Sequence, residues 1–290
     1  MTAEYRLGLV LITASAIAWS STGFFTRLIP LDLWTLLLGR GLFGALGLAA
    51  VIVALEGRRG IARFAKLGRP GWVFALVSAA GMVCFIAALR HTTVAHVSVI
   101  YATVPFMAAV LAWAVMRERP SRRALAASLA ALLGVAIMVG FGREGGAWGD
   151  ALAVLMTFGM AVMMVIARRH RDIPVMQAAC LSAVLSGLAC WPWAAGGALE
   201  TGLELGQWGL LAAFGLVNSA LGLGLFTLGA RRLPAVETAL IGALDAPLAP
   251  LWVWLAFGET PSASTALGGA VVFGAVVCHV GLSARTRAVA

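Results

Sequence analysis

The chain has 290 residues, of which 61% are hydrophobic and only 11% are charged. Its mean hydropathy is +0.96, whereas soluble domains carry about 25% charged residues. Because water would not solvate so apolar a surface, the composition excludes a soluble domain and predicts a membrane protein.

A membrane-spanning helix needs about 20 mostly apolar residues, so the chain has room for roughly ten helices if the loops are short. In chain order the predicted helices are Leu7–Ile29, Leu33–Leu55, Trp72–Leu89, Val94–Met116, Ala124–Gly140, Trp148–Ala167, Val175–Ala195, Trp208–Ala230, Ala235–Phe257 and Thr265–Ser283. The third and fifth are the shortest, and nine helices is the alternative count. The predicted fold class is an all-α polytopic membrane protein.

The basic residues alternate with this helix order. With the amino terminus in the cytoplasm, the cytoplasmic segments carry 17 Lys and Arg, the opposite side carries 3, and Arg40 lies inside a helix. Cytoplasmic loops accumulate Lys and Arg, so both termini are predicted to be cytoplasmic. The net charge of +9 is spread over short loops, which argues against nucleic acid as a partner and favours contact with membrane lipid headgroups.

Motifs for chemistry are absent from the sequence. The four cysteines all fall inside predicted helices without metal-ligand spacing, and there is no HExxH, GxSxG or nucleotide-binding loop. We therefore expect no metal, no cofactor, no enzymatic activity and no direct use of ATP. An intramembrane aspartyl enzyme would need a second Asp at membrane depth, and a channel would need a ring of repeated polar residues.

An internal repeat divides the sequence into two parts. Ala88-Leu89-Arg90, Pro105 and Glu118-Arg119-Pro120 are matched by Gly229-Ala230-Arg231, Pro247 and Glu259-Thr260-Pro261, most of them 141 positions later. Small residues at every fourth position extend the match, with Ala126, Ala130 and Gly134 answered by Ala266, Ala270 and Gly274. Such spacing favours close packing of helices in lipid.

Each half holds five predicted helices, and because five is odd, the second half must enter the membrane in the opposite direction. The predicted domains are 1–142 and 143–290, two inverted repeats. Inverted repeats are a recurring build of secondary transporters, which bind substrate between the halves near the membrane midplane. The alternative is that two duplicated halves merely pack together.

A set of residues distributed over the whole chain carries a family resemblance. It comprises Ala18-Trp19-Ser20-Ser21, Arg40, Ala88-Leu89, Pro105, Glu118 and Gly134-Val135, then Gly149-Asp150, Pro247, Glu259 and Gly268-Gly269. With these residues the sequence resembles the ten-helix, EamA-type branch of the drug/metabolite transporter superfamily. Trp19-Ser20 and the stretch from Tyr101 to Pro105 are similar to the YddG-type exporters of aromatic amino acids.

The resemblance implies ten helices around a central cavity and a secondary transporter of the bacterial inner membrane. Its expected activity is export of amino acids, aromatic and other neutral ones favoured, or of related small metabolites, by alternating access. A different metabolite or drug class is the alternative substrate. We expect the protein to act as a monomer.

Polar residues at membrane depth are the candidate site residues, because a charge at mid-bilayer costs about 2.5 to 3.5 kcal/mol. Asp245 lies roughly 15 Å into the ninth helix, with Pro247 beyond it to free backbone carbonyls. We expect Asp245 either to bind a substrate ammonium or a proton, or to be a neutral Asp bonded to a neighbouring helix. Arg40 lies only about 10 Å deep, where it either snorkels to the surface or attracts a carboxylate.

Trp19, Ser20, Ser21 and Tyr101 are expected to supply hydroxyl donors and aromatic surface to a substrate. The alternative for the two aromatic residues is that they fill the helix bundle. His96 is expected either to bond a carbonyl at the membrane interface or to act in gating or proton handling.

Three further residues, Pro105, Asn218 and Glu237, are candidates for a structural or gating role, as is Pro247. Bonding between helices or anchoring at the membrane interface would suffice for Asn218 and Glu237. As a hypothesis, Asp245 or His96 couples transport to a proton.

Overall fold

The computed structural model describes the backbone of residues 3–92, 94–139, 146–196, 202–258 and 260–289, and most of their side chains. Within these ranges the chain is helical and has no strand, so the predicted all-α class is confirmed. In chain order the elements are α1 (Ala3–Ser20), α2 (Thr22–Leu28), α3 (Leu33–Glu56), α4 (Arg58–Ala62), η1 (Arg63–Lys66), α5 (Gly68–His91), α6 (Val94–Tyr101), α7 (Val104–Met116), α8 (Arg122–Val139), α9 (Ala147–Arg169), α10 (Val175–Ala194), α12 (Leu205–Phe214), η2 (Gly215–Leu223), α13 (Gly224–Ala230), α14 (Ala235–Gly242), α15 (Asp245–Phe257) and α16 (Ala263–Val289).

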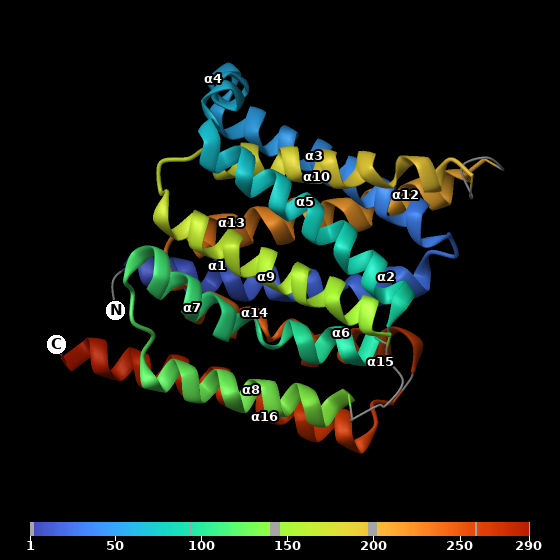
Figure 1. Ribbon diagram of the computed structural model, residues 1–290. Helices are drawn as coiled ribbons and strands as arrows, with labels where there is room; N and C mark the ends of the chain where they lie inside the picture. The colour runs from blue at the N-terminus through green and yellow to red at the C-terminus, as the bar shows by residue number, and fades with distance from the viewer. Residues whose placement is uncertain (1–2, 93, 140–145, 197–201, 259, 290) are drawn as a thin grey trace.

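Several consecutive elements join end to end into long rods (Figure 1). In the described residues, nine helical stretches are long and apolar enough to cross a membrane. The remaining long helix is α8, which begins with Arg122 and Arg123 and lies along α16 (Figure 1). Large apolar side chains such as Leu55, Leu255 and Leu267 are exposed on the outside of the bundle, as expected for a surface that contacts lipid.

Both chain ends lie at the same end of the bundle (Figure 1). The start of α1 shares this end with Arg168, Arg171, Arg231 and Arg232. Arg59, Arg63 and Lys66 lie nearby around Asp172. We call this the basic end, and it is the end that the sequence predicts to be cytoplasmic.

Packing between the rods follows a two-fold relation between the halves. Counterpart rods pack on each other: α3 on α10, α8 on α16, and the rod α6–α7 on the rod α14–α15 through α7 and α14. The other large contacts come in pairs related by the two-fold relation. The contact of α5 with α9 corresponds to that of η2 and α13 with α1, and the contact of α3 with η2 corresponds to that of α10 with α5. Because α8 and α16 run in opposite directions (Figure 1), the repeats are inverted.

Glycines permit the closest contacts between counterpart helices. A Cβ on Gly41 of α3 would lie 2.7 Å from the Cα of Gly187 in α10, and one on Gly134 of α8 would lie 2.8 Å from the carbonyl oxygen of Gly268 in α16. Both distances are too short for a real Cβ contact, so only glycine allows the backbones to approach this closely.

The predicted stripe of small residues forms this contact only in part. Gly134 lies in it, but Ala126, Ala266, Ala270 and Gly274 are exposed. The buried faces of the two helices instead present Ala131, Val135, Val272 and Val276. The small residues at every fourth position identify the two helices that pack together but not the helix faces that meet. Adjacent positions on a helix point about 100° apart, so residues one position away lie on a different face.

Candidate functional site between the two halves

The first rod is interrupted where the sequence analysis placed Trp19, Ser20 and Ser21. Helix α1 ends at Ser20, and α2 begins at Thr22. The hydroxyls of Ser20, Ser21 and Thr22 each donate to the carbonyl oxygen three positions earlier, at 2.7, 2.5 and 2.6 Å. Such bonds compete with the regular helix, and they use the hydroxyl hydrogens that were expected to serve a substrate.

Helix η2 faces this interruption from the second half of the chain. It is a π-helix, a form that leaves backbone carbonyls outside the normal α-helical pattern and is frequent at functional sites. The indole of Trp19 donates to the carbonyl oxygen of Asn218 at 3.1 Å, and the hydroxyl of Ser15 donates to that of Gly222 at 2.8 Å. No pattern in the sequence indicated the π-helix.

Arg40 and Asn218 form the polar centre of this contact. Arg40 donates from a terminal guanidinium nitrogen to Asn218 Oδ1 at 2.6 Å, and Asn218 Nδ2 donates to Thr22 Oγ1 at 2.7 Å. Arg40 is only 8% exposed and lies 5.9 Å from the ring centre of Phe214. It therefore does not snorkel to the surface, because α12 and η2 cover it.

The Arg40 guanidinium has a neutral amide as its partner. Among the described residues, no carboxylate forms an ion pair with it, and its buried Nε has no hydrogen-bond partner. A buried cation that is paired only with a neutral group is costly. The site therefore has an unmet preference for an anionic group.

Aromatic side chains from the second half complete the surroundings of the α1 interruption. The rings of Trp19 and Phe226 lie 5.0 Å apart. The indole of Trp252 in α15 donates to the Ser20 hydroxyl at 2.8 Å. The interruption is thus bonded to both η2 and α15, and every one of these contacts joins the two halves.

Two other rods are interrupted at counterpart positions. The fourth predicted helix breaks between Tyr101 and Val104, and the ninth breaks between Gly242 and Asp245. The two breaks lie 141 positions apart in the sequence. The sequence analysis expected both helices to be continuous. Pro105 and Pro247 lie just inside the second half-helices, where a missing N–H costs nothing.

Asp245 is therefore not in the middle of a helix but is the first residue of α15. A helix amino terminus favours negative charge. Tyr101, at the end of α6, is close enough to interact with it electrostatically. Discontinuous helices of this kind commonly form the substrate and ion sites of transporters.

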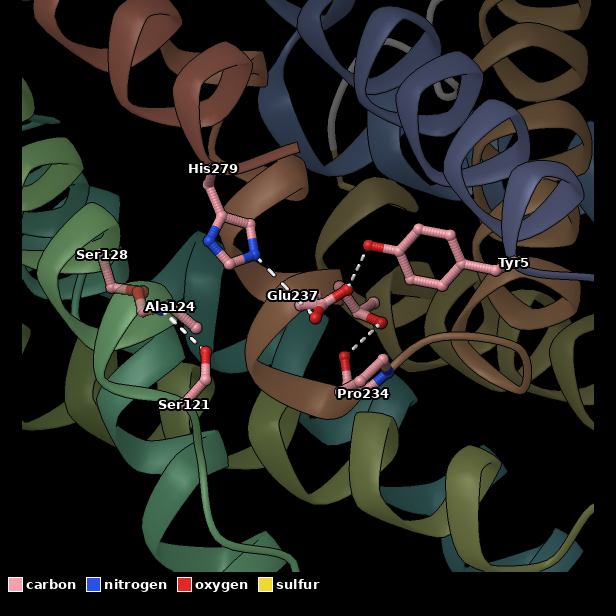
Figure 2. A network of polar contacts seen from close by, with 8 residues as sticks. Tyr5, Ser121, Ala124, Ser128, Pro234, Glu237 and His279 are labelled. Atoms are coloured by element: carbon pink, nitrogen blue, oxygen red, sulfur yellow. Dashed lines mark hydrogen bonds and ion pairs between the residues drawn. The ribbon is translucent and has the colours of Figure 1, made fainter. Parts of the chain in front are cut away.

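The remaining predicted site residues lie elsewhere or cannot be placed. The side chain of His96 is outside the described part of the structure. Glu237 lies in the first turn of α14 at the basic end, where it contacts Tyr5 and His279 (Figure 2). The sequence analysis singled out neither Tyr5 nor His279, although His279 is a polar residue inside an apolar run.

Two cavities open at the basic end. One, of about 470 Å³, is lined by Glu4, Tyr5, Arg168, Arg171, Arg231, Arg232 and Pro234. The other, of about 460 Å³, is lined by Arg59, Ala62, Arg63, Lys66, Asp172 and Pro174. Burial and then the neighbouring charge of Arg232 lower the pKa of the Arg231 guanidinium. None of the predicted site residues is among those that line the two cavities.

Comparison with known proteins assigns the chain to a family. The model of the EamA-like transporter family matches twice, over residues 6–140 and 147–281. The chain belongs to the EamA-like transporter family. The two matches are offset by 141 residues, as are the helix breaks, so this EamA-like protein contains two copies of the family repeat. It is a multi-pass membrane protein of a family of small-metabolite transporters.

A crystal structure described only as "Crystal structure of protein" shares the fold of this EamA-like protein. The TM-score is 0.78 at 18% sequence identity, over 97% of this chain and 98% of the other. No curated protein matches the sequence.

Proposed function

We propose that this protein exports amino acids, favouring aromatic and other neutral ones, across the bacterial inner membrane by alternating access. The buried Arg40 supports this proposal most directly. Its guanidinium lies between the halves with a neutral partner and an unbonded Nε, so a substrate carboxylate would supply the missing negative charge. This burial favours the predicted contact of Arg40 with a carboxylate over the predicted snorkelling to the surface.

Other groups from the second half, together with Trp19, match the rest of an amino acid. Asp245, at the break of the ninth helix, is an acceptor for the ammonium group. Trp19, Phe226 and Trp252 offer aromatic surface for an apolar side chain. The two halves, residues 1–142 and 143–290, would rock around this site as a monomer.

The cavities at the basic end support the proposed export direction. With that end in the cytoplasm, as the distribution of Lys and Arg predicts, both termini are cytoplasmic. The two cavities at that end then give a cytoplasmic substrate its way in.

Counterflow tests the proposal. Purified protein in liposomes loaded with unlabelled phenylalanine, leucine, a nucleoside or a cationic drug is given the same compound in labelled form outside. We expect phenylalanine and leucine to stimulate uptake, which neither an enzyme nor a channel would produce. If only the nucleoside or the drug stimulated uptake, that compound class would replace amino acids as the proposed substrate. If no compound stimulated uptake, the result would contradict the proposal that the protein is a transporter.

Arg40→Gln tests the carboxylate contact. Loss of a charged hydrogen bond costs about 1.5 to 3 kcal/mol, so we expect roughly a tenfold to hundredfold fall in counterflow. Arg27→Gln is the control, because Arg27 is an exposed arginine in α2. An Arg40→Gln protein that transports like the wild type would remove Arg40 from the site.

A further inference from the structure

Three buried or half-buried polar side chains meet at the basic end, away from the site around Arg40. The hydroxyl of Tyr5 donates to Glu237 Oε2 at 2.7 Å, and His279 Nε2 lies 3.9 Å from Glu237 Oε1. Figure 2 shows Glu237 between the other two. Tyr5 is 5%, Glu237 7% and His279 3% exposed, so all three are inside the protein.

The imidazole of His279 has an unused capacity for hydrogen bonding. Neither of its ring nitrogens has a hydrogen-bond partner among the described residues. The 3.9 Å separation from the Glu237 carboxylate is too long for a hydrogen bond but short enough for an ion pair to form. A proton on Nε2 would supply the donor and the charge that this contact lacks, and imidazole is the side-chain group that ordinarily changes charge near neutral pH.

Tyr5 also gives this pair a connection to water. It lines the 470 Å³ cavity of the basic end, and the same hydroxyl group bonds Glu237. One side chain thus separates the buried carboxylate from an open cavity. A proton that enters the cavity can reach Glu237 when the Tyr5 side chain moves aside.

The cluster also spans the boundary between the two halves. Tyr5 comes from α1 of the first repeat, whereas Glu237 and His279 come from α14 and α16 of the second. Beside them, Arg232 pairs with Glu4 at 3.0 Å across the same boundary. A rocking motion of the halves would therefore change the access of Glu237 to water, as a coupling site requires.

Few other charged groups face the pair from the neighbouring elements. The sequence of α7 has no titratable residue, and neither has that of α13. The elements packed against the pair carry, toward the basic end, Glu4 and Arg6 on α1, Arg122 and Arg123 on α8, Arg168 and Arg169 on α9, and Arg231 and Arg232 before α14, and α16 itself carries Arg285 and Arg287. Arg168 pairs with Glu118, and Arg169 donates to the carbonyl of Val115.

We propose that Glu237 and His279 bind the proton that drives transport, and that this proton leaves past Tyr5 into the cavity at the basic end. This inference rests on the proposed function and gives it an energy source. It assigns the proton to a site separate from the substrate groups, whereas the sequence analysis considered Asp245 or His96. The step is a proton transfer: an O–H or N–H bond forms on the pair when a proton arrives from water on one side of the membrane, and it breaks when the proton leaves to water on the other.

Two transport assays separate this inference from the proposed function. Counterflow of labelled phenylalanine at equal pH reports substrate exchange, and accumulation under a pH gradient at zero voltage reports coupling. For one proton per substrate, a gradient of one pH unit should give about tenfold accumulation by the wild type. We expect Glu237→Gln to keep counterflow and to bring the accumulation ratio close to one, while Glu204→Gln, an exposed control, keeps both.

Infrared difference titration of the purified protein between about pH 5 and 8 provides a readout that needs no substrate. We expect a titrating signal from the carboxyl or imidazole group that is absent in Glu237→Gln and present in Glu204→Gln. If Glu237→Gln does not fold, His279→Gln and Tyr5→Phe replace it. His279→Gln should lower the accumulation ratio, and Tyr5→Phe should slow the approach to an unchanged ratio.

The outcomes are distinct. Wild-type counterflow without accumulation overturns the coupling site, as does full accumulation by Glu237→Gln or by His279→Gln. An infrared signal that persists in Glu237→Gln also overturns it. Absence of counterflow in the wild type, with the infrared signal lost only in the Glu237 or His279 variants, would refute the proposed function but support the proton site.

Discussion

Two interrupted rods at counterpart positions, α6–α7 in the first repeat and α14–α15 in the second, have the same backbone path but different side chains at the break. Their breaks lie 141 positions apart, and a proline follows each break. At the break, however, Val104 of the first repeat corresponds to Asp245 of the second, and Tyr101 corresponds to Gly242. Duplication therefore preserved the shape of the interruption, whereas the groups that can bind a ligand differ between the repeats.

The side chains also differ in the first turn of the two rods, in α6 and in α14. At the offset of 141, His96 is the counterpart of Glu237. The inverted topology places these two positions toward opposite ends of the bundle. A transporter binds a substrate that itself has no symmetry, so it needs unequal side chains on a symmetric backbone. Substitutions of counterpart residues should therefore have unequal effects.

The largest inequality should be between Asp245→Asn and Val104→Ala. Loss of the Asp245 charge removes the proposed partner of the substrate ammonium. We expect counterflow of phenylalanine to fall by roughly tenfold to a hundredfold, corresponding to about 1.5 to 3 kcal/mol. Val104→Ala, measured per amount of folded protein, should transport nearly as well as the wild type. Equal losses in both variants would show that the break, and not the carboxylate, carries the function.

A second inequality concerns the glycines of α8 and α16 that the repeat aligns. Gly134→Leu would force a side chain against the backbone of Gly268, whereas Gly274 has no atom of another element within 4 Å of a Cβ. We expect Gly134→Leu to lower stability by about 1 to 3 kcal/mol, and Gly274→Leu to leave it unchanged within about 0.5 kcal/mol. Thermal unfolding in detergent measures both, and a similar loss in the two variants would contradict the packing described for α8 and α16.

The smallest effect, and an equal one, is expected for the prolines after the two breaks. Both lie in the first turn of a half-helix, where they mainly restrict the unfolded chain. Pro105→Ala and Pro247→Ala should each cost about 0.4 to 1 kcal/mol of stability. Transport should continue in both. If only Pro247→Ala abolished counterflow, Pro247 would belong to the substrate site and would not serve only the helix backbone.

The apolar runs were sufficient to predict the helical rods and their order, because each rod needs enough apolar residues to cross the membrane. The breaks were not predicted, because Ala102, Thr103, Ala243 and Leu244 are compatible with a helix and only the following prolines gave a signal. The π-helix η2 has no signature beyond its glycines.

The site was predictable residue by residue but not as an arrangement. Arg40, Asn218, Trp19 and Asp245 stood out as polar or aromatic groups at membrane depth. Their partners could not be found, since Asn218 lies 178 positions from Arg40 and depth alone does not tell which face of a helix a residue occupies. The depth argument for Arg40 assumed an exit to water, which the packing of α12 and η2 closes.

The glycine contacts between α3 and α10 and between α8 and α16 restrict how the halves can move. They lie on opposite sides of the bundle (Figure 1), and at both the backbones touch without intervening side chains. Sliding along either contact would bring a larger neighbouring side chain against a backbone. Rotation of one half against the other about the two glycine contacts would avoid this collision, and it would displace most the helix ends, which lie farthest from the contacts.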